Sequence, residues 1–179
     1  KIHFAVRVIG MESHIAYICL GSNMGSRAEN CMTGINLLDE SEESSLLARS
    51  LFYYTEPVDY MDQDWFVNIL EQIETSLDPF QLIKKLKKIE ADSGRTSDGI
   101  RFGPRILDMD IILYDAMIID SKDLIIPHPR MHERCFVLKP LCDIDPEIVH
   151  PLLGKKINDL LDNLNNEEQK VIPYKCSQK

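Results

Sequence analysis

Hydrophobic and polar positions alternate, or recur every three to four residues, along most of the chain, and these two periods predict its secondary structure. Runs of β-branched and aromatic residues bounded by turn residues indicate strands. The strands expected in this way are Ile15–Leu20, Ser45–Tyr54, Trp65–Ile73 and Ile106–Tyr114. Ala116–Ile119 is expected to pair with the last of them across a turn at Asp115.

Apolar residues at helical spacing predict two long helices and two short ones. Ser26 is expected to cap the first together with Glu29 in an S-x-x-E box. The second begins at Asp78-Pro79, an N-cap residue followed by proline, and ends at Gly94. Residues expected on the buried faces are Cys31, Ile35 and Leu38 in the first helix and Phe80, Leu82, Ile83, Leu86 and Ile89 in the second. The short helices are expected around Phe136–Asp143 and Lys156–Asn163.

The order of these elements is β-α-β-β-α-β, followed by a hairpin and further helices. This order is typical of an α+β fold, the ferredoxin-like sandwich, in which helices flank an antiparallel sheet. Two polar segments, Thr55–Asp64 and Thr96–Pro104, are expected to be loops. We expect one domain at residues 11–164, an upstream segment of open origin at residues 1–10 and a frayed polar tail at residues 165–179.

The composition narrows the possible functions. With 179 residues, of which 44% are hydrophobic, the chain can bury one core. Its formal net charge of −9 argues against long nucleic acid as a partner, but it leaves room for a small anionic ligand in a locally basic pocket. The five cysteines form no Cys-x-x-Cys pair, and no apolar stretch approaches the roughly 20 residues that span a bilayer. We therefore expect a cytoplasmic protein with free thiols and no membrane partner.

Candidate chemistry is concentrated in one window of the sequence. Asp108 and Asp110 lie two residues apart on a predicted strand, so their carboxylates project from the same face. A solvated strand face would explain such a pair, but the apolar neighbours Leu107, Met109 and Ile111 make this strand look central. Two carboxylates so placed repel each other unless a cation lies between them, and Mg²⁺ prefers oxygen ligands. The pair is therefore a candidate Mg²⁺ site.

Basic residues in the same window point to phosphate. Guanidinium groups suit bidentate contacts with phosphate, although any one arginine is equally explained by surface solubility. Five of the eight arginines fall here: Arg95, Arg101, Arg105, Arg130 and Arg134. His128 is a candidate phosphate donor, whereas its spacing from His132 does not define a metal site, because Pro129 lies between them. The chain has neither a P-loop nor a G-x-G-x-x-G turn.

From the residues alone we therefore expect a Mg²⁺ and phosphate site on a small α+β sandwich. Two general classes of function fit these residues: a Mg²⁺-dependent phosphotransferase and a non-catalytic ligand-binding module. Within the first class, the motifs below separate one particular enzyme family from other phosphotransferases.

Several motifs resemble one enzyme family. The run Arg101–Ile111 (RFGPRILDMDI), the later Ile126–Pro129 (IPHP) and Arg134-x-Phe136 are similar to 6-hydroxymethyl-7,8-dihydropterin pyrophosphokinase of folate biosynthesis. Leu20–Asn23 and the loop and strand over Thr55–Asn68 fit in order, so the resemblance covers about Ala16 to Asn163. It implies transfer of the β,γ-pyrophosphoryl group of ATP to the hydroxymethyl oxygen of the pterin, with release of AMP.

The resemblance also implies roles for individual residues. Asp108 and Asp110 would hold two Mg²⁺ ions and act in catalysis together with Arg95 and Arg105, one of the aspartates assisting the attacking hydroxyl. Residues implied to bind ATP are Lys87, Glu90, Arg95, Arg105, Ile111, His128 and Arg134. Residues implied to bind the pterin are Thr55, Glu56, Pro57, Val58, Phe66, Asn68, Asp108 and Phe136, the two phenylalanines enclosing the ring. The partners are then the two small-molecule substrates, and we expect a monomer.

The chain departs from the family pattern at four positions. Ser97 stands where some members have a second loop arginine, and Phe102 where tryptophan is common. Asp123 and Ile125 replace a basic residue and a threonine near the adenosine end. These changes affect the expected nucleotide contacts but leave the acidic pair and the two phenylalanines in place.

Overall fold

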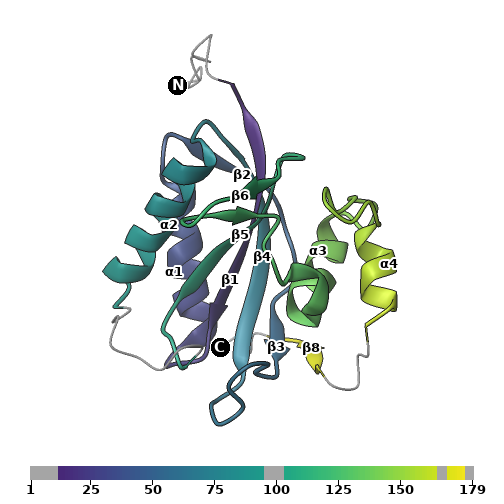
Figure 1. The fold of residues 1–179 in the computed structure, drawn as a ribbon. Coiled ribbons are helices and arrows are strands. Elements are labelled where there is room, and N and C mark those ends of the chain that lie inside the picture. The colour runs from purple at the N-terminus through teal and green to yellow at the C-terminus, as the bar shows by residue number, and fades with distance from the viewer. Residues whose placement is uncertain (1–11, 95–102, 165–168, 176–179) are drawn as a thin grey trace, which may run out of the picture.

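The computed structural model describes residues 12–94, 103–164 and 169–175, and a six-stranded antiparallel sheet runs through them (Figure 1). Its strands are β1 (His14–Ser22), β2 (Ser44–Arg49), β3 (Tyr53–Thr55), β4 (Phe66–Thr75), β5 (Asp108–Tyr114) and β8 (Val171–Pro173). The order across the sheet is β5-β1-β4-β3-β8, and β2 also pairs with β4. The long strands β1 and β4 therefore form its centre.

Helices cover both faces of this sheet, as Figure 1 shows. On one side lie α1 (Arg27–Asp39) and α2 (Pro79–Asp92), and on the other α3 (Cys135–Ile144) and α4 (Ile157–Asp162). A short 3-10 helix, η1 (Met131–Glu133), precedes α3. A separate two-stranded sheet joins β6 (Ile119–Asp120) to β7 (Ile125–Ile126). The predicted α+β sandwich with an antiparallel sheet and flanking helices is confirmed.

Alternation along the central strands builds two cores. In β1, Ile18 and Leu20 pack against α1 and α2, whereas Tyr17 and Cys19 pack on the side of α3 and α4. Because both faces of the sheet are covered, both sets of positions are apolar, and the strand appears in the sequence as a nearly continuous hydrophobic run.

The two long helices begin differently. Asp78 caps α2, since its carboxylate accepts hydrogen bonds from the backbone of Phe80 and Gln81, and the Gln81 side chain completes the box. Ser26 precedes α1 but makes no side-chain cap bond, so the expected S-x-x-E box is wrong. The ψ angle of Ser26 is 72°, whereas that of Asp78 is 164°, the extended conformation that turns a capping oxygen towards the free helix amides.

Two expectations about burial and strand length are also corrected. Phe80, expected in the buried face of α2, is 42% exposed. The expected strand Ser45–Tyr54 divides into β2 and β3, because Ser50 interrupts the pairing: its hydroxyl accepts a hydrogen bond from the Leu70 amide.

The polar tail contributes a strand where fraying was expected. Within the described residues, β8 pairs with the edge of β3. Just before it, the Gln169 side chain donates a hydrogen bond to the Glu133 carbonyl at 2.8 Å and accepts one from the Cys135 amide at 2.9 Å. The segment before β8 is therefore fastened to the start of α3.

The expected pairing of Ala116–Ile119 with β5 is wrong, because β6 pairs with β7 instead. Asp115 has a positive φ of 45° and turns the chain away at the end of β5. Its amide donates to the Ile15 carbonyl at 2.7 Å, and its carboxylate accepts from the Ile15 amide at 2.8 Å. These bonds hold the turn against β1, so the next residues leave the sheet.

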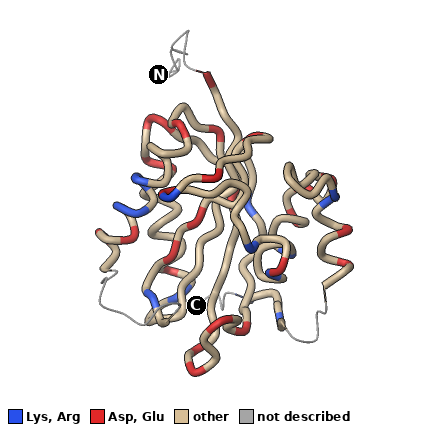
Figure 2. Tube along the Cα trace, viewed as in Figure 1, with Lys and Arg blue, Asp and Glu red and all other residues tan. Residues whose placement is uncertain are grey.

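Charge and hydropathy agree with this architecture. Acidic residues are spread over strands, helices and loops (Figure 2), so the net charge of −9 does not reflect a single acidic face. Among the described residues, no helix is both long and apolar enough to cross a membrane.

Candidate active site

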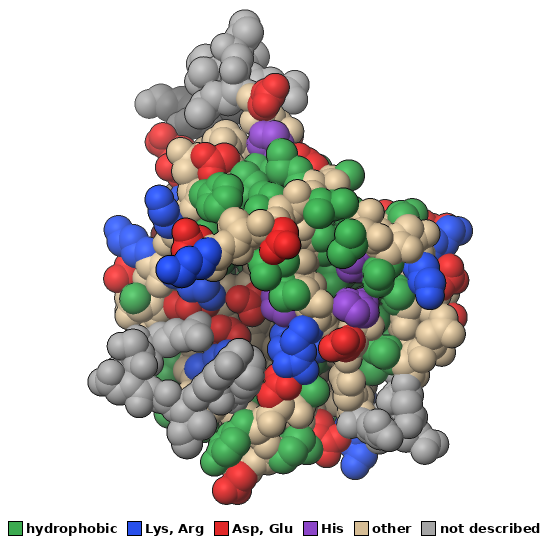
Figure 3. All heavy atoms as spheres, in the orientation of Figure 1, with side chains coloured by type: hydrophobic (Ala, Val, Ile, Leu, Met, Phe, Trp, Pro, Cys, Tyr) green, Lys and Arg blue, Asp and Glu red, His purple; other side chains and the backbone are tan. Residues whose placement is uncertain are grey.

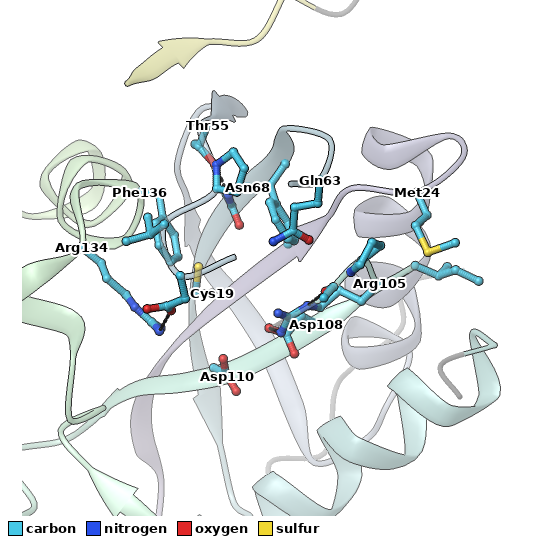
Figure 4. Close-up of a pocket in the computed structure, with 18 of the residues that line it drawn as sticks. Cys19, Met24, Thr55, Gln63, Asn68, Arg105, Asp108, Asp110, Arg134 and Phe136 are labelled. Atoms are coloured by element: carbon cyan, nitrogen blue, oxygen red, sulfur yellow. Dashed lines mark hydrogen bonds and ion pairs between the residues drawn. The ribbon is translucent and has the colours of Figure 1, made fainter. Parts of the chain in front are cut away.

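A cavity of about 590 Å³ opens at one end of the strands. Because the strands are antiparallel, the end of β1, the end of β3 and the beginnings of β4 and β5 all lie at this end of the sheet. Side chains from these strands point into the cavity (Figure 4), and acidic, basic and histidine side chains gather on the corresponding face of the molecule (Figure 3). The sheet topology thus brings distant parts of the sequence to one site.

Most of the residues expected at the site line this cavity. They are Thr55, Glu56, Pro57, Val58, Phe66, Asn68, Lys87, Arg105, Asp108, Asp110, His128, Arg134 and Phe136. Glu90 lies beneath it, and Ile111 lines a smaller adjoining hollow. Arg95, Arg101, Ser97 and Phe102 lie outside the described residues.

We call Lys87, Asp108, Asp110 and His128 the charged wall. Asp108 and Asp110 both face the cavity, while Met109 between them is fully buried in the core under α1 and α2. The predicted shared face of the two carboxylates is confirmed. Burial raises the pKa of Asp110, but the positive charge of Lys87 opposes it, and the pKa lies below its usual value. Asp110 is therefore ionised at neutral pH.

Glu90 supports the charged wall from below. It is 2% exposed, and its Oε1 accepts hydrogen bonds from the Met109 amide at 2.6 Å and from Lys87 Nζ at 2.7 Å. Lys87 Nζ also donates to the Met109 carbonyl at 3.0 Å and lies 3.4 Å from Asp110 Oδ1. Glu90 thus joins α2 to β5 and fixes the lysine beside the acidic pair.

His128 is a neutral donor in this wall. Burial lowers its pKa, although Asp110 acts in the opposite direction. Its Nδ1 accepts a hydrogen bond from the Arg130 amide at 3.2 Å, which leaves the proton on Nε2. An Nε2–H of this kind can donate to a phosphate oxygen.

We call Thr55, Phe66, Asn68 and Phe136 the aromatic wall. Asn68 Nδ2 donates to Thr55 Oγ1 at 2.6 Å, which fixes the amide plane. Gly21 lies opposite Asn68 in the sheet, and a Cβ at this glycine would overlap with Asn68 Oδ1. Only glycine therefore lets the amide approach β1 so closely. The wall offers two rings and a fixed amide, a suitable surface for a flat heterocycle.

Two arginines lie against the rings of the aromatic wall. Arg105 Nη1 is 2.6 Å from Asp108 Oδ2, and its guanidinium lies 5.7 Å from the centroid of the Phe66 ring. Arg134 Nη2 is 3.3 Å from Asp59 Oδ2, and its guanidinium lies 5.4 Å from the centroid of the Phe136 ring. Each arginine thus pairs with a carboxylate and covers one ring of the aromatic wall.

Sequence reasoning missed two residues that hold the site together. Asn23, 2% exposed, donates through Nδ2 to Gln63 Oε1 at 3.0 Å and accepts from the Arg105 amide at 2.8 Å. It thereby joins the two segments that border the cavity. Asp59 lines the cavity and pairs with Arg134. The Gly-Ser-Asn turn gave a signal for Asn23, whereas nothing in the sequence singled out Asp59.

Together these features fit one class of protein: a small α+β protein that binds a phosphorylated ligand beside a flat ring. A family profile described as 7,8-dihydro-6-hydroxymethylpterin-pyrophosphokinase matches residues 17–146. The chain belongs to this family and is accordingly a pyrophosphokinase of folate biosynthesis, which transfers pyrophosphate from ATP to the hydroxymethyldihydropterin.

Individual relatives agree. The chain is 43% identical over 136 residues to the 2-amino-4-hydroxy-6-hydroxymethyldihydropteridine pyrophosphokinase of Bacillus subtilis, covering 76% of this chain and 81% of that protein. It is 40% identical over 154 residues to the folic acid synthesis protein FOL1 of Dictyostelium discoideum, covering 86% of this chain but only 23% of that protein. A Plasmodium falciparum HPPK-DHPS structure with pteroate has a TM-score of 0.69 at 18% identity, covering 89% of this chain and 46% of that one, and it supports the fold alone.

Proposed function

We propose that the cavity between the charged wall and the aromatic wall is the active site for this pyrophosphoryl transfer. The observation that carries the proposal is that the acidic pair, the two rings and the fixed amide line one cavity at the ends of the strands. The charged wall takes the phosphates of ATP, and the aromatic wall takes the pterin. The hydroxymethyl oxygen would then lie between them.

The residues present fit Mg²⁺ ions. Asp108 and Asp110 both line the cavity, and within the described residues no group of three or more His, Cys, Asp or Glu side chains could hold a metal ion. Two carboxylates suit Mg²⁺, which takes its remaining ligands from water and substrate phosphates. When bound, two such ions would neutralise charge on the phosphates and stabilise the transition state.

On the nucleotide side, cationic and neutral donors are available. Lys87, Arg105, His128 and Arg134 all reach the cavity and donate hydrogen bonds to phosphate oxygens. Glu90 acts through Lys87, and Arg95 is expected to contribute from outside the described residues. The adjoining hollow, which Ile111 lines together with Lys122, Asp123 and Ile125, extends from Asp110 and His128 and suits the nucleoside.

On the pterin side, Phe66 and Phe136 enclose the ring and Asn68 binds its polar edge. Backbone groups of Thr55, Glu56, Pro57 and Val58 bind the rest of that edge. Asp108 lies opposite Gly21 in the sheet, and Gly21 lies opposite Asn68, so Asp108 adjoins the pterin side and Asp110 the nucleotide side. Asp108 would therefore orient the attacking hydroxyl.

The product of the reaction tests this function. The protein is incubated with ATP, Mg²⁺ and 6-hydroxymethyl-7,8-dihydropterin, and the nucleotide product is separated by chromatography. We expect AMP that forms only when the pterin is present. ADP would instead indicate a simple kinase, and the absence of any product would indicate a binding module. The monomeric state and the cytoplasmic location remain predictions.

A further inference from the structure

Asp59 lines the cavity and forms a bridge between two arginines. Its Oδ1 lies 2.7 Å from Arg130 Nη1, and its Oδ2 lies 3.3 Å from Arg134 Nη2. Asp59 belongs to the loop between β3 and β4, whereas the two arginines flank η1, which precedes α3. The bridge therefore ties the loop that carries Pro57 and Val58 to the segment that carries Arg134.

Arg134 has donor capacity that this bridge does not use. Its side chain is 12% exposed, and its buried Nε has no hydrogen-bond partner among the described residues. A buried guanidinium donor without an acceptor is costly, so the group is suited to bind an anion. A phosphate that engages Arg134 would compete with the Asp59 carboxylate, because both are anionic acceptors for the same guanidinium.

We propose that Asp59 is a positioning residue that holds Arg134 in the ligand-free protein and gives it up to the phosphates of the bound nucleotide. The shorter pair between Asp59 and Arg130 then remains and keeps the loop attached to the segment before η1. This inference rests on the proposed function, because it needs ATP phosphates at Arg134.

Nucleotide affinity tests the proposal. Binding of a non-hydrolysable ATP analogue with Mg²⁺ is measured by calorimetry for the unaltered protein, Asp59→Asn and Asp59→Glu. We expect Asp59→Asn to bind about fivefold more tightly, because a partly buried ion pair no longer competes. Asp59→Glu keeps the carboxylate and should bind like the unaltered protein. The matched control is Asp62→Asn, which removes the same charge from an exposed position of the same loop that does not line the cavity.

The same substitutions in an Arg134→Ala protein separate two effects of Asp59: its ion pair with Arg134 and its general repulsion of the anionic nucleotide. In Arg134→Ala, Asp59→Asn should change the affinity by no more than Asp62→Asn does, because the guanidinium for which Asp59 competes is gone. An equal gain with and without Arg134 would overturn the proposal, as would unchanged or weaker binding in Asp59→Asn alone. If the unaltered protein binds no analogue, the proposed function itself fails.

Discussion

The two walls of the cavity are stabilised in different ways. In the charged wall, Lys87 and Asp110 pair with each other before any ligand arrives, and Glu90 fixes the lysine from below. In the aromatic wall, Asn68 is held by one neutral hydrogen bond to Thr55 and by close packing against Gly21. The charged wall can exchange its internal partners for phosphate and metal, whereas the aromatic wall is preformed. One cavity thus combines an adaptable half with a rigid half.

The largest expected effect comes from removing an acid of the charged wall. Asp110→Ala should lower AMP formation by about a thousandfold or more, because transition-state charge loses several kcal/mol of stabilisation. Chromatographic detection of AMP measures this loss. Asp120→Ala, which removes an exposed aspartate of β6, is the control and should retain activity. Full activity in a folded Asp110→Ala variant would contradict the role of the charged wall.

A methyl group at Gly21 should damage the aromatic wall selectively. In Gly21→Ala the new Cβ displaces the Asn68 amide, so affinity for the pterin should fall by about tenfold to a hundredfold. Nucleotide affinity of the same variant, measured by calorimetry, is the internal control and should stay within about twofold. Equal losses for both ligands would show that the walls are not separable.

Glu71 in β4 is a buried acid that lies outside both walls, and its titration affects the stability of the fold. Burial raises the pKa of Glu71 from 4.5 to about 7, although Arg49, whose Nε donates to it at 2.6 Å, acts in the opposite direction. The folded state therefore holds this proton more tightly than the unfolded state. The contribution of this tightly held proton to the free energy of unfolding is fully present below about pH 4.5 and is lost as the pH rises through about 7.

Glu71→Gln should flatten this dependence, because the amide does not titrate. Urea unfolding at several pH values measures the effect. The free energy of unfolding should fall less between about pH 5 and about pH 8 in the variant than in the unaltered protein, since this range spans the loss of the Glu71 proton. An identical slope in both proteins would show that Glu71 does not titrate in this range.

The smallest effects are expected at the helix starts. Asp78→Ala removes the cap of α2, the helix that carries Lys87, and should lower the free energy of unfolding by about 1 kcal/mol. Ser26→Ala removes no side-chain cap bond, so it should cost less than about 0.5 kcal/mol. Urea unfolding of both variants checks this, and a larger loss in Ser26→Ala would contradict the described helix start.

The sequence predicted the charged wall better than the aromatic wall, for a physical reason. Asp108 and Asp110 share a face because strand side chains alternate, and this is a local rule. Phe66 and Phe136 have the spacing of ordinary core residues, so only the family resemblance marked them. Contacts such as Asn23 with Arg105 join residues 82 positions apart, and no local pattern records them.

The same limit explains the errors in the fold. The long strands and α2 follow from strong periods, whereas β8 is a short apolar segment in a polar tail that becomes a strand only where β3 offers an edge. The missing cap at Ser26 depends on one backbone angle, which the residue type does not determine.

A crossed titration tests the separation of the two walls most directly. Binding of the Mg²⁺–ATP analogue and of the pterin is measured separately for the unaltered protein, Asp110→Ala and Gly21→Ala. The account predicts that Asp110→Ala loses nucleotide affinity and keeps pterin affinity, whereas Gly21→Ala does the reverse. The account would be contradicted if both variants lost affinity for the same ligand, or if each variant lost affinity for both ligands.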